Sequence, residues 1–478
     1  MPLASFLYIF GWGTCSLALI MLAPLLVALG GVEQEFAHIF LYSFLLTSFV
    51  GGALISIGTP PRGREKNMAA MLLSAVCYWL VLPLLAAIPF WAGIENWTIT
   101  RAYFEAVSGL TTTGMTLLHY PEGEQQSILL WRAMLNWLGG AWTLFFGMAV
   151  FSRLGIGELV GRGIIFDRAR KGVFSPLLVA IGWLYVPISI LGIALLWVMG
   201  APFFEAICFG LSAISTGGFS PISGGVNTIF PPLAELVLCL MMLFGAIGLP
   251  IHIFLFRGRF QILLSDEELR GFFIFLLLLF GIFLLAIFFS EGWNISKIFS
   301  AFVSAVSFIS STGFVMAEGA PWGVPVILLG IIALIGTMGL STGGGVKLFR
   351  VLIWIKSIAS QLRLYIFPHA SQEIMLSGRV LSQNALHSLC LSLLLYPFCF
   401  ALLMGILGMT GVDFYLAWIG LVSALGNMSG IFLHSEGGAH WLMQSNSSSL
   451  SVLGLAMVLG RIEFLAFLAL LNPAYWRR

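Results

Sequence analysis

Four short stretches of the 478-residue sequence share one pattern of small and hydroxyl-bearing residues. They read VSGLTTTGMTLL at 107–118, LSAISTGGFSPI at 211–222, VSFISSTGFVMA at 306–317 and VSALGNMSGIFL at 422–433. When the first serine of each stretch is aligned, a glycine follows six residues later in the first three stretches, and Ser429 follows in the fourth. Each stretch lies between two long apolar segments. The pattern therefore predicts an internal repeat with four copies.

The composition places the chain in a membrane. Hydrophobic residues make up 59% of the sequence and charged residues 9%, whereas an ordinary soluble domain is about 25% charged. A soluble protein this apolar would lack the polar surface needed to cover its core. These proportions exclude a soluble enzyme, a nucleic-acid-binding protein and a disordered chain, and the net charge of +2 gives no reason to expect a polyanionic partner. We therefore predict an all-α polytopic membrane protein.

Ten apolar stretches are long enough to cross a bilayer, which requires about 20 residues. They lie at about 5–29, 36–57, 68–92, 127–152, 177–200, 232–256, 271–290, 323–357, 382–409 and 449–472. The repeated stretches are too short to cross and fall between the later spans, so the last eight spans are expected to form four helix–pore loop–helix repeats with pseudo-fourfold symmetry around one pore. The predicted units are 1–67 for the two extra N-terminal helices, and 68–171, 172–265, 266–365 and 366–478 for the four pore repeats.

The distribution of charge predicts the orientation. Every cluster of Lys and Arg follows an even-numbered span, as Arg62, Arg64 and Lys66 follow the second. Because cytoplasmic loops carry the excess of basic residues, both termini are predicted to be cytoplasmic. No Lys or Arg precedes Arg62, so the first apolar stretch is expected to be a span and not a cleaved signal peptide. The opposite loops carry mostly acidic residues, including Glu105, which either concentrate cations at an entrance or form ordinary solvated loops.

The repeated stretches have the chemistry of a cation filter, with close packing of small helix residues as the structural alternative. A half-helix that ends near the bilayer centre directs its negative dipole end there, which favours a cation. The Thr-, Ser- and Gly-rich chain after it is tolerated at that depth only where it lines a cavity or is buried in protein. Glycine allows positive φ, so successive carbonyl groups can point the same way, and four such loops offer rings of oxygens that replace an ion's hydration shell. The candidate filter residues are Thr111, Thr112, Thr113, Gly114, Ser215, Thr216, Gly217, Gly218, Ser311, Thr312, Gly313, Asn427, Met428 and Ser429.

The eighth span is interrupted by GTMGLSTGGGVKLFR at 336–350. Glycine costs about 1 kcal/mol relative to alanine inside a helix, so this run predicts a break in the span. It is not a phosphate-binding loop, because Leu348 and not Ser or Thr follows Lys347. The break is either a gate or a kink that packs closely on another helix. The candidate gate residues are Gly336, Gly339, Ser341, Thr342, Gly343, Gly344, Gly345 and Lys347.

Arg461 lies within the last span, with Glu463 nearby. A charge at that depth is expensive and usually faces the interior of the bundle or a cavity, which makes Arg461 the candidate pore-facing charge. It would limit conduction by repelling cations, tie down a filter loop, or form an ion pair with another repeat. Glu463 is the clear intramembrane carboxylate that a coupled symport would need.

The remaining reactive residues form no recognisable catalytic motif. The six cysteines fall in apolar stretches without a CxxC pair and are expected to be buried small residues. His434 and His440 flank Glu436, which suggests a metal site less strongly than it suggests a polar outer loop. A membrane-embedded enzyme would need Asp, His or Cys clustered near one interface, and the sequence has no such cluster.

The sequence resembles the Trk/Ktr/HKT superfamily of cation transporters, in particular the membrane subunit of bacterial Trk potassium uptake systems. The resemblance covers nearly the whole chain and rests on TTTGMT, STGGFS and SSTGF in the repeated stretches, on the interrupted eighth span and on VLGRIEF in the tenth. It implies potassium uptake across the bacterial inner membrane, with K+ bound at the filter residues above and with no cofactor. It also implies a homodimer in contact with membrane lipids, a cytosolic regulatory subunit with nucleotide-binding domains, and no nucleic-acid partner. In the family, the loop at 336–347 is an intramembrane gate beneath the filter, and a basic residue stands near the pore at Arg461.

Two departures from the family pattern leave alternatives open. The gate pattern is close to GGxxGSTxGGxK, and Thr337 and Leu340 stand where glycines are usual, which predicts a stiffer loop. The fourth loop of the family usually has a filter glycine, but this chain reads GNMSGI. Either Ser429 replaces that glycine, with strain of about 1–2 kcal/mol, or Gly430 takes its place. The rival functions are a sodium-permeable or weakly selective transporter of the same fold, and a cation symporter.

Overall fold

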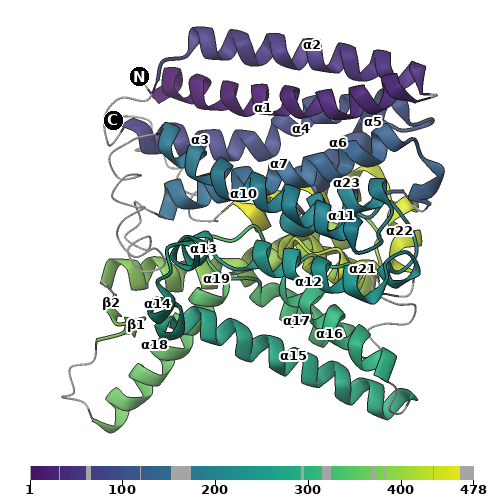
Figure 1. Cartoon of the computed structure of the whole chain (residues 1–478). Coiled ribbons are helices and arrows are strands. Elements are labelled where there is room, and N and C mark those ends of the chain that lie inside the picture. Colours follow the sequence, from purple (N-terminus) through teal and green to yellow (C-terminus); the bar gives the residue numbers. More distant parts are fainter. Residues whose placement is uncertain are drawn as a thin grey trace.

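The computed structural model describes residues 2–31, 33–60, 66–118, 120–151, 174–291, 295–314, 324–367, 373–381, 383–433, 435 and 437–462. These residues are predominantly helical (Figure 1). The six longest helices are α1 (Pro2–Gly30), α2 (Gln34–Ile57), α7 (Gln126–Phe151), α10 (Phe174–Val198), α15 (Glu267–Glu291) and α19 (Gln383–Met409). In the described part of the chain, the one antiparallel hairpin is formed by β1 (Met375–Leu376) and β2 (Arg379–Val380).

Shorter helices complete the bundle. Four of them lead into the repeated stretches: α6 (Ile99–Leu110), α11 (Phe203–Ile214), α16 (Ile295–Ile309) and α20 (Phe414–Gly426). The others are α3 (Lys66–Leu80), α4 (Leu82–Ala86), α5 (Ile88–Gly93), η1 (Pro121–Gly123), η2 (Val226–Thr228), α12 (Pro232–Ala246), α13 (Leu249–Phe256), α14 (Phe260–Ser265), α17 (Val326–Ile335), α18 (Leu348–Ile366), α21 (Gly430–Leu433), α22 (Gly438–Gln444) and α23 (Ser447–Arg461).

The described helices include membrane-spanning ones, as the composition predicts. Six of them are long and apolar enough to cross, or eight if α12 with α13 and α22 with α23 each count as one bent span. Two expected spans are not among these. The stretch at 127–152 corresponds to the 26-residue α7, and the stretch at 323–357 is divided, since α17 ends at Ile335 and α18 begins at Leu348. The helix break expected from the glycine run is confirmed.

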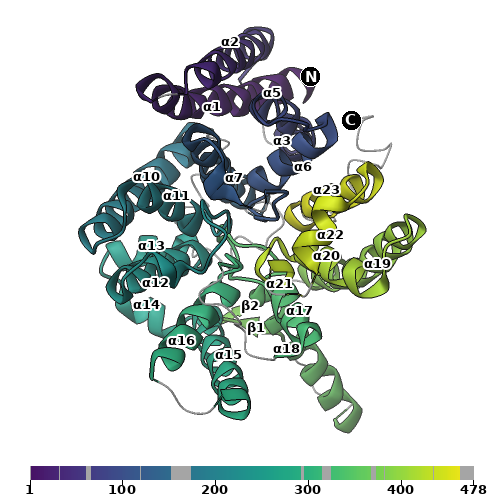
Figure 2. The ribbon, with the colours of Figure 1, turned by 90° about the vertical axis from the view of Figure 1, so that its right-hand side faces the viewer.

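The helices follow one another around a central region that loops fill (Figure 2). Going around in chain order, α6 and α7 are followed by α10 to α12, then α15 to α17, then α19 and α20, and α23 packs against α6 to close the ring. α1 and α2 lie side by side outside it, where α1 also contacts α3 and α7. The arrangement brings the ends of α6, α11, α16 and α20 towards the centre.

Glycines let α1 and α2 approach closely, as in many membrane helix pairs. A Cβ added at Gly51 would lie 2.7 Å from the Cys15 Sγ atom and 3.0 Å from the Cys15 backbone nitrogen. A Cβ added at Gly52, on the neighbouring face of α2, would meet nothing within 4 Å. The two positions form a matched pair for testing how α1 and α2 pack.

We expect Gly51→Ala to lower the thermal unfolding midpoint of the purified protein by a few degrees relative to Gly52→Ala. Both substitutions gain helix propensity of about 1 kcal/mol, but overpacking at Gly51 costs about 1–3 kcal/mol. Differential scanning fluorimetry in detergent measures both midpoints. Equal midpoints would contradict this account of the α1–α2 contact.

Candidate functional site

Each repeated stretch ends its helix with the same turn. The amide of the residue five positions after the aligned serine donates to that serine's carbonyl oxygen, at 2.8–3.1 Å in all four stretches. The preceding amide donates to the carbonyl oxygen three residues before it, at 2.9–3.2 Å. These two hydrogen bonds, together with the left-handed conformation of the residue that donates the second one, define a Schellman motif. The left-handed residues are Thr112 (φ 52°), Thr216 (φ 53°), Ser311 (φ 58°) and Asn427 (φ 48°).

The aligned glycines adopt a second left-handed conformation two residues later. Gly114 and Gly218 have φ of 77° and Gly313 has φ of 75°. The fourth stretch differs, because neither Ser429 nor Gly430 has positive φ and α21 begins at Gly430. Both alternatives weighed from the sequence are therefore wrong as backbone descriptions. In the fourth loop the left-handed turn at Asn427 is not followed by a second one.

The four loops converge at one place. A Cβ added at Gly114 would collide with the Gly217 carbonyl oxygen, and one added at Gly218 would collide with that of Thr312. A Cβ at Gly313 would lie 2.5 Å from the Gly430 amide nitrogen. Of the fourteen candidate filter residues, all but the glycines appear among the buried side chains, at 0–1% exposure.

The Ser429 hydroxyl lies at this junction. A Cβ at Gly114 or Gly218 would lie 3.0 or 2.9 Å from its Oγ atom. The side chain is 0% exposed, and the Oγ atom has no hydrogen-bond partner among the described residues. A buried hydroxyl without a partner is costly. The fourth loop thus places a side-chain oxygen beside two glycines of the other loops.

Polar side chains from within and outside the repeated stretches hold the loops in register. The Asn427 Nδ2 atom donates to Thr113 Oγ1 at 2.8 Å and to the Met457 carbonyl oxygen at 3.0 Å. Asn136 of α7 joins the first repeated stretch to the second. Its amide nitrogen donates to the Gly109 carbonyl oxygen at 2.9 Å, and its side-chain oxygen accepts from Ser212 Oγ at 3.0 Å. The sequence analysis missed Asn136, although a lone amide within an apolar span is a signal for such a role.

The interrupted span forms a loop that bonds mainly to itself and to α12. The Lys347 ammonium donates to Thr337 Oγ1 at 3.1 Å, to Ser341 Oγ at 3.2 Å and to the Gly343 carbonyl oxygen. Thr337 replaces a usual glycine without adopting positive φ, whereas Leu340 adopts φ of 57°. A left-handed Leu is strained by about 1–2 kcal/mol. We call residues 336–347 the gate loop.

The gate loop contacts three of the repeated stretches directly and is linked to the other one by Arg461. The Thr342 Oγ1 atom donates to the Ile214 carbonyl oxygen at 3.2 Å and lies 3.4 Å from Thr216 Oγ1. The Gly344 amide donates to Ser311 Oγ at 2.9 Å, and a Cβ added to Gly344 would lie 2.6 Å from the Asn427 Cβ. The first stretch is reached through Arg461.

Arg461 connects three parts of the site. Its guanidinium donates to Thr143 Oγ1 on α7 at 3.0 Å, to Thr112 Oγ1 and to the Thr342 carbonyl oxygen. Arg461 therefore contacts both a filter loop and the gate loop. Glu463, the carboxylate considered for symport, lies outside the described residues.

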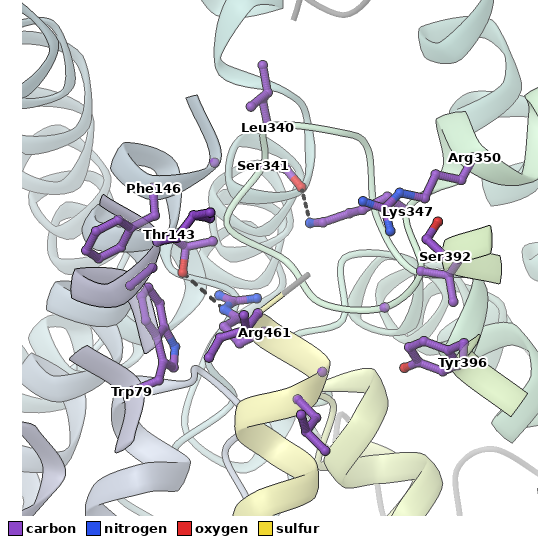
Figure 3. Close-up of a pocket in the computed structure, with 18 residues that line it drawn as sticks. Trp79, Thr143, Phe146, Leu340, Ser341, Lys347, Arg350, Ser392, Tyr396 and Arg461 are labelled. Carbon is purple, nitrogen blue, oxygen red and sulfur yellow. Dashed lines mark hydrogen bonds between the residues drawn. The ribbon is translucent and has the colours of Figure 1, made fainter. Parts of the chain in front are cut away.

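Two cavities lie against this assembly and share no lining residue. One, of about 250 Å³, is lined by Gly114, Gly218 and Arg132 among others. The second, of about 110 Å³, is lined by Arg461, Lys347 and other residues that Figure 3 labels. Gly114 and Gly218 line the first cavity, and part of the gate loop lines the second.

A buried ion pair supports the loops near the larger cavity. Glu105 on α6, 0% exposed, pairs with Arg132 on α7, 2% exposed, at 3.0 Å. The same carboxylate accepts from Thr116 Oγ1 at 2.7 Å, and Arg132 donates to the Ser220 carbonyl oxygen at 3.0 Å. Nearby, burial raises the pKa of the Glu124 carboxyl, an effect that the Arg132 charge opposes and the Glu105 charge reinforces. Glu105 is thus a structural acceptor and not a solvated loop residue.

The other sequence candidates carry no chemistry that the structure reveals. All six cysteines are free. The described residues contain no group of three His, Cys, Asp or Glu side chains suited to a metal ion. His434 and Glu436 lie outside the described residues.

Comparisons with known proteins agree with this geometry. Residues 37–476 match the model of the TrkH family, described as cation transport proteins. The Trk system potassium uptake protein TrkH of Salmonella typhimurium is 30% identical over 91% of this chain and 92% of its own length. TrkH of Halomonas elongata is 27% identical over the whole of both chains. The crystal structure of the potassium transporter TrkH from Vibrio parahaemolyticus superposes with a TM-score of 0.87 over the whole of both chains, at 26% identity.

A family model that covers most of the chain, and relatives that align along nearly its whole length, leave one assignment: the chain belongs to the TrkH family of cation transport proteins.

Proposed function

We propose that this chain is the membrane subunit of a bacterial potassium uptake system and that K+ passes inward through a filter formed by the four repeated stretches. The relatives named above are potassium uptake proteins. The observation that carries the proposal is the convergence of four helix-ending turns of the same kind at one place, with Gly114 and Gly218 also lining a cavity. The ten spans, their division into two N-terminal helices and four pore repeats, and their pseudo-fourfold arrangement belong to the same proposal.

The filter would work through backbone and hydroxyl oxygens. The C-terminal ends of α6, α11, α16 and α20 meet at the loops, and a helix C-terminus favours a cation. In the first three loops, left-handed residues at alternate positions would turn carbonyl groups the same way, so that their oxygens can replace the hydration shell of K+. The ion is driven inward by about 2.3 kcal/mol per charge for each 100 mV of membrane potential. No cofactor enters this mechanism, since K+ is the cargo.

The gate loop would close the path beneath the filter. It contacts every filter loop directly or through Arg461, and the Arg461 and Lys347 charges face the cavity on its far side. A cation leaving the filter would meet these charges, so conduction requires the loop to move.

The remaining expectations complete the proposal. The chain would lie in the inner membrane among its lipids, with both termini cytoplasmic, as a homodimer. A cytosolic subunit with nucleotide-binding domains would move the gate loop.

A second candidate function is a sodium-permeable or weakly selective transporter, and Ser429 favours it. Its unpartnered oxygen beside Gly114 and Gly218 is an additional ligand that narrows the filter. A narrower site with more oxygen favours the smaller ion.

Gly218→Ala should reduce K+ flux at least tenfold in liposomes that contain the purified chain. The new Cβ would sit 2.9 Å from Ser429 Oγ at a residue whose φ of 77° suits glycine. Gly224→Ala is the control, because it also lines the larger cavity but a Cβ there would meet Thr228 only at 3.4 Å. Normal flux through the Gly218 variant would remove the second loop from the pore.

Ser429→Gly and Ser429→Ala should both raise the K+/Na+ permeability ratio severalfold, because both remove the additional hydroxyl ligand. Reversal potentials under paired K+ and Na+ gradients give the ratio for each variant and for the unmodified chain. A clear K+ preference of the unmodified chain supports potassium uptake, whereas a ratio near one supports the second candidate. If Ser429→Ala has the permeability ratio of the unmodified chain and only Ser429→Gly differs, the bulk of the side chain and not its oxygen sets selectivity.

Arg461→Gln should increase K+ flux severalfold without a regulatory subunit, because the gate loop loses a charged tie to Thr112 and α7. Arg101→Gln, at a residue whose guanidinium donates to the Met443 carbonyl oxygen at 2.7 Å, removes a charge outside the gate and should leave flux unchanged. A fall in flux with normal folding would instead mean that Arg461 shapes the conducting filter.

A further inference from the structure

Glu268 is a buried carboxylate that the sequence analysis did not single out. It stands in the first turn of α15 and is 5% exposed. Its Oε1 atom accepts from the Gly339 amide at 2.6 Å, and the backbone of Phe349 also hydrogen-bonds to the carboxylate. Gly339 belongs to the gate loop and Phe349 to the first turn of α18. One side chain thus bonds to the chain on both sides of residues 340–348.

The residue before Glu268 is tied to the neighbouring elements. The Glu267 carboxylate pairs with Lys356 on α18, and its amide donates to Ser377 Oγ at 3.2 Å. Lys356 also donates to the Met375 carbonyl oxygen at 2.7 Å. Figure 1 shows α14, α18 and the β1–β2 hairpin gathered at this end of α15. Contacts therefore run from the hairpin through α15 and α18 to the gate loop.

We infer that Glu268 is a positioning residue that latches the gate loop in its closed conformation, and that movement of α18 or the hairpin relative to α15 releases it. The inference rests on the proposed function, because it assigns the regulation of the same gate. The Gly339 amide is a direct backbone partner of this buried side chain. A buried carboxylate that loses its partners is costly, so the loop and the start of α15 have two discrete arrangements and few intermediate ones.

The test compares Glu268→Gln with Asp266→Asn in the full-length purified chain. Asp266 is two residues away, and its Oδ1 atom accepts from the Leu269 amide at 2.9 Å. Asn at this position keeps an oxygen that can cap α15 and leaves the hydrogen bonds of Glu268 in place, while it removes a charge that acts on Glu268 only electrostatically. We expect Glu268→Gln to raise K+ flux into liposomes about tenfold in the absence of any partner, and Asp266→Asn to change it less than twofold. The K+/Na+ permeability ratio should stay the same in both variants, since the filter is untouched.

Hydrogen–deuterium exchange provides the second readout. The amides of 336–349 should exchange faster in Glu268→Gln than in Asp266→Asn, while those of the repeated stretches should not. Unchanged flux and unchanged exchange in a folded variant would show that Glu268 only stabilises the bundle. If Glu268→Gln does not fold, Glu268→Asp replaces it. Its K+ flux and its amide exchange then test the latch in the same way.

The two levels of failure are distinguishable. If Arg461→Gln raises flux but Glu268→Gln alters neither flux nor exchange, the latch is wrong and the gate stands. If neither the unmodified chain nor any variant conducts cations, the proposed function fails. Faster exchange in Glu268→Gln would still show that Glu268 holds the gate loop.

Discussion

The constraint on which this structure depends is that non-helical backbone inside a membrane must find its hydrogen-bond partners within the protein. Four loops interrupt helices at the centre of this chain, and each begins by returning two amides to its own helix. The gate loop, which joins the end of α17 to the start of α18, bonds partly to itself, as from the Thr337 amide to the Gly344 carbonyl oxygen. Its other groups bond to Gly245, Ser311, Glu268 and Arg461, which lie far apart in the sequence. The hydrogen bonds of this one loop therefore connect distant parts of the helical bundle.

Features that local chemistry determines could be predicted from the sequence. Aligning Ser108 with its three counterparts located the four stretches that share one turn, although not the hydrogen bonds that close it. The glycine run located the break between Ile335 and Leu348. Composition established the membrane class, because the proportion of charged residues does not depend on the fold.

Features that could not be predicted depend on which distant residues meet. Nothing in the sequence near Glu268 indicates that its carboxylate accepts from Gly339, 71 residues away. From the sequence, Glu105 was assigned to an acidic loop, because its partner Arg132 comes 27 residues later and on another helix. The fourth loop was misjudged for a related reason. A glycine is needed only at a position whose φ is positive. Which position that is depends on the neighbouring loops that pack against Ser429 and Gly430.

The alternatives for Arg461 need not compete. The same guanidinium that lines the cavity of about 110 Å³ also donates to Thr112 and to the carbonyl oxygen of Thr342. In water such bonds would contribute little, but in a low-dielectric interior an uncompensated cation gains much from oxygen ligands. These oxygens belong to the filter loop and the gate loop, so solvating the charge and closing the loop are one arrangement. In the proposed gating, opening requires other oxygens, or water entering the cavity, to take over the charge. The proposal therefore links the position of the gate loop to the hydration of the cavity that Arg461 lines.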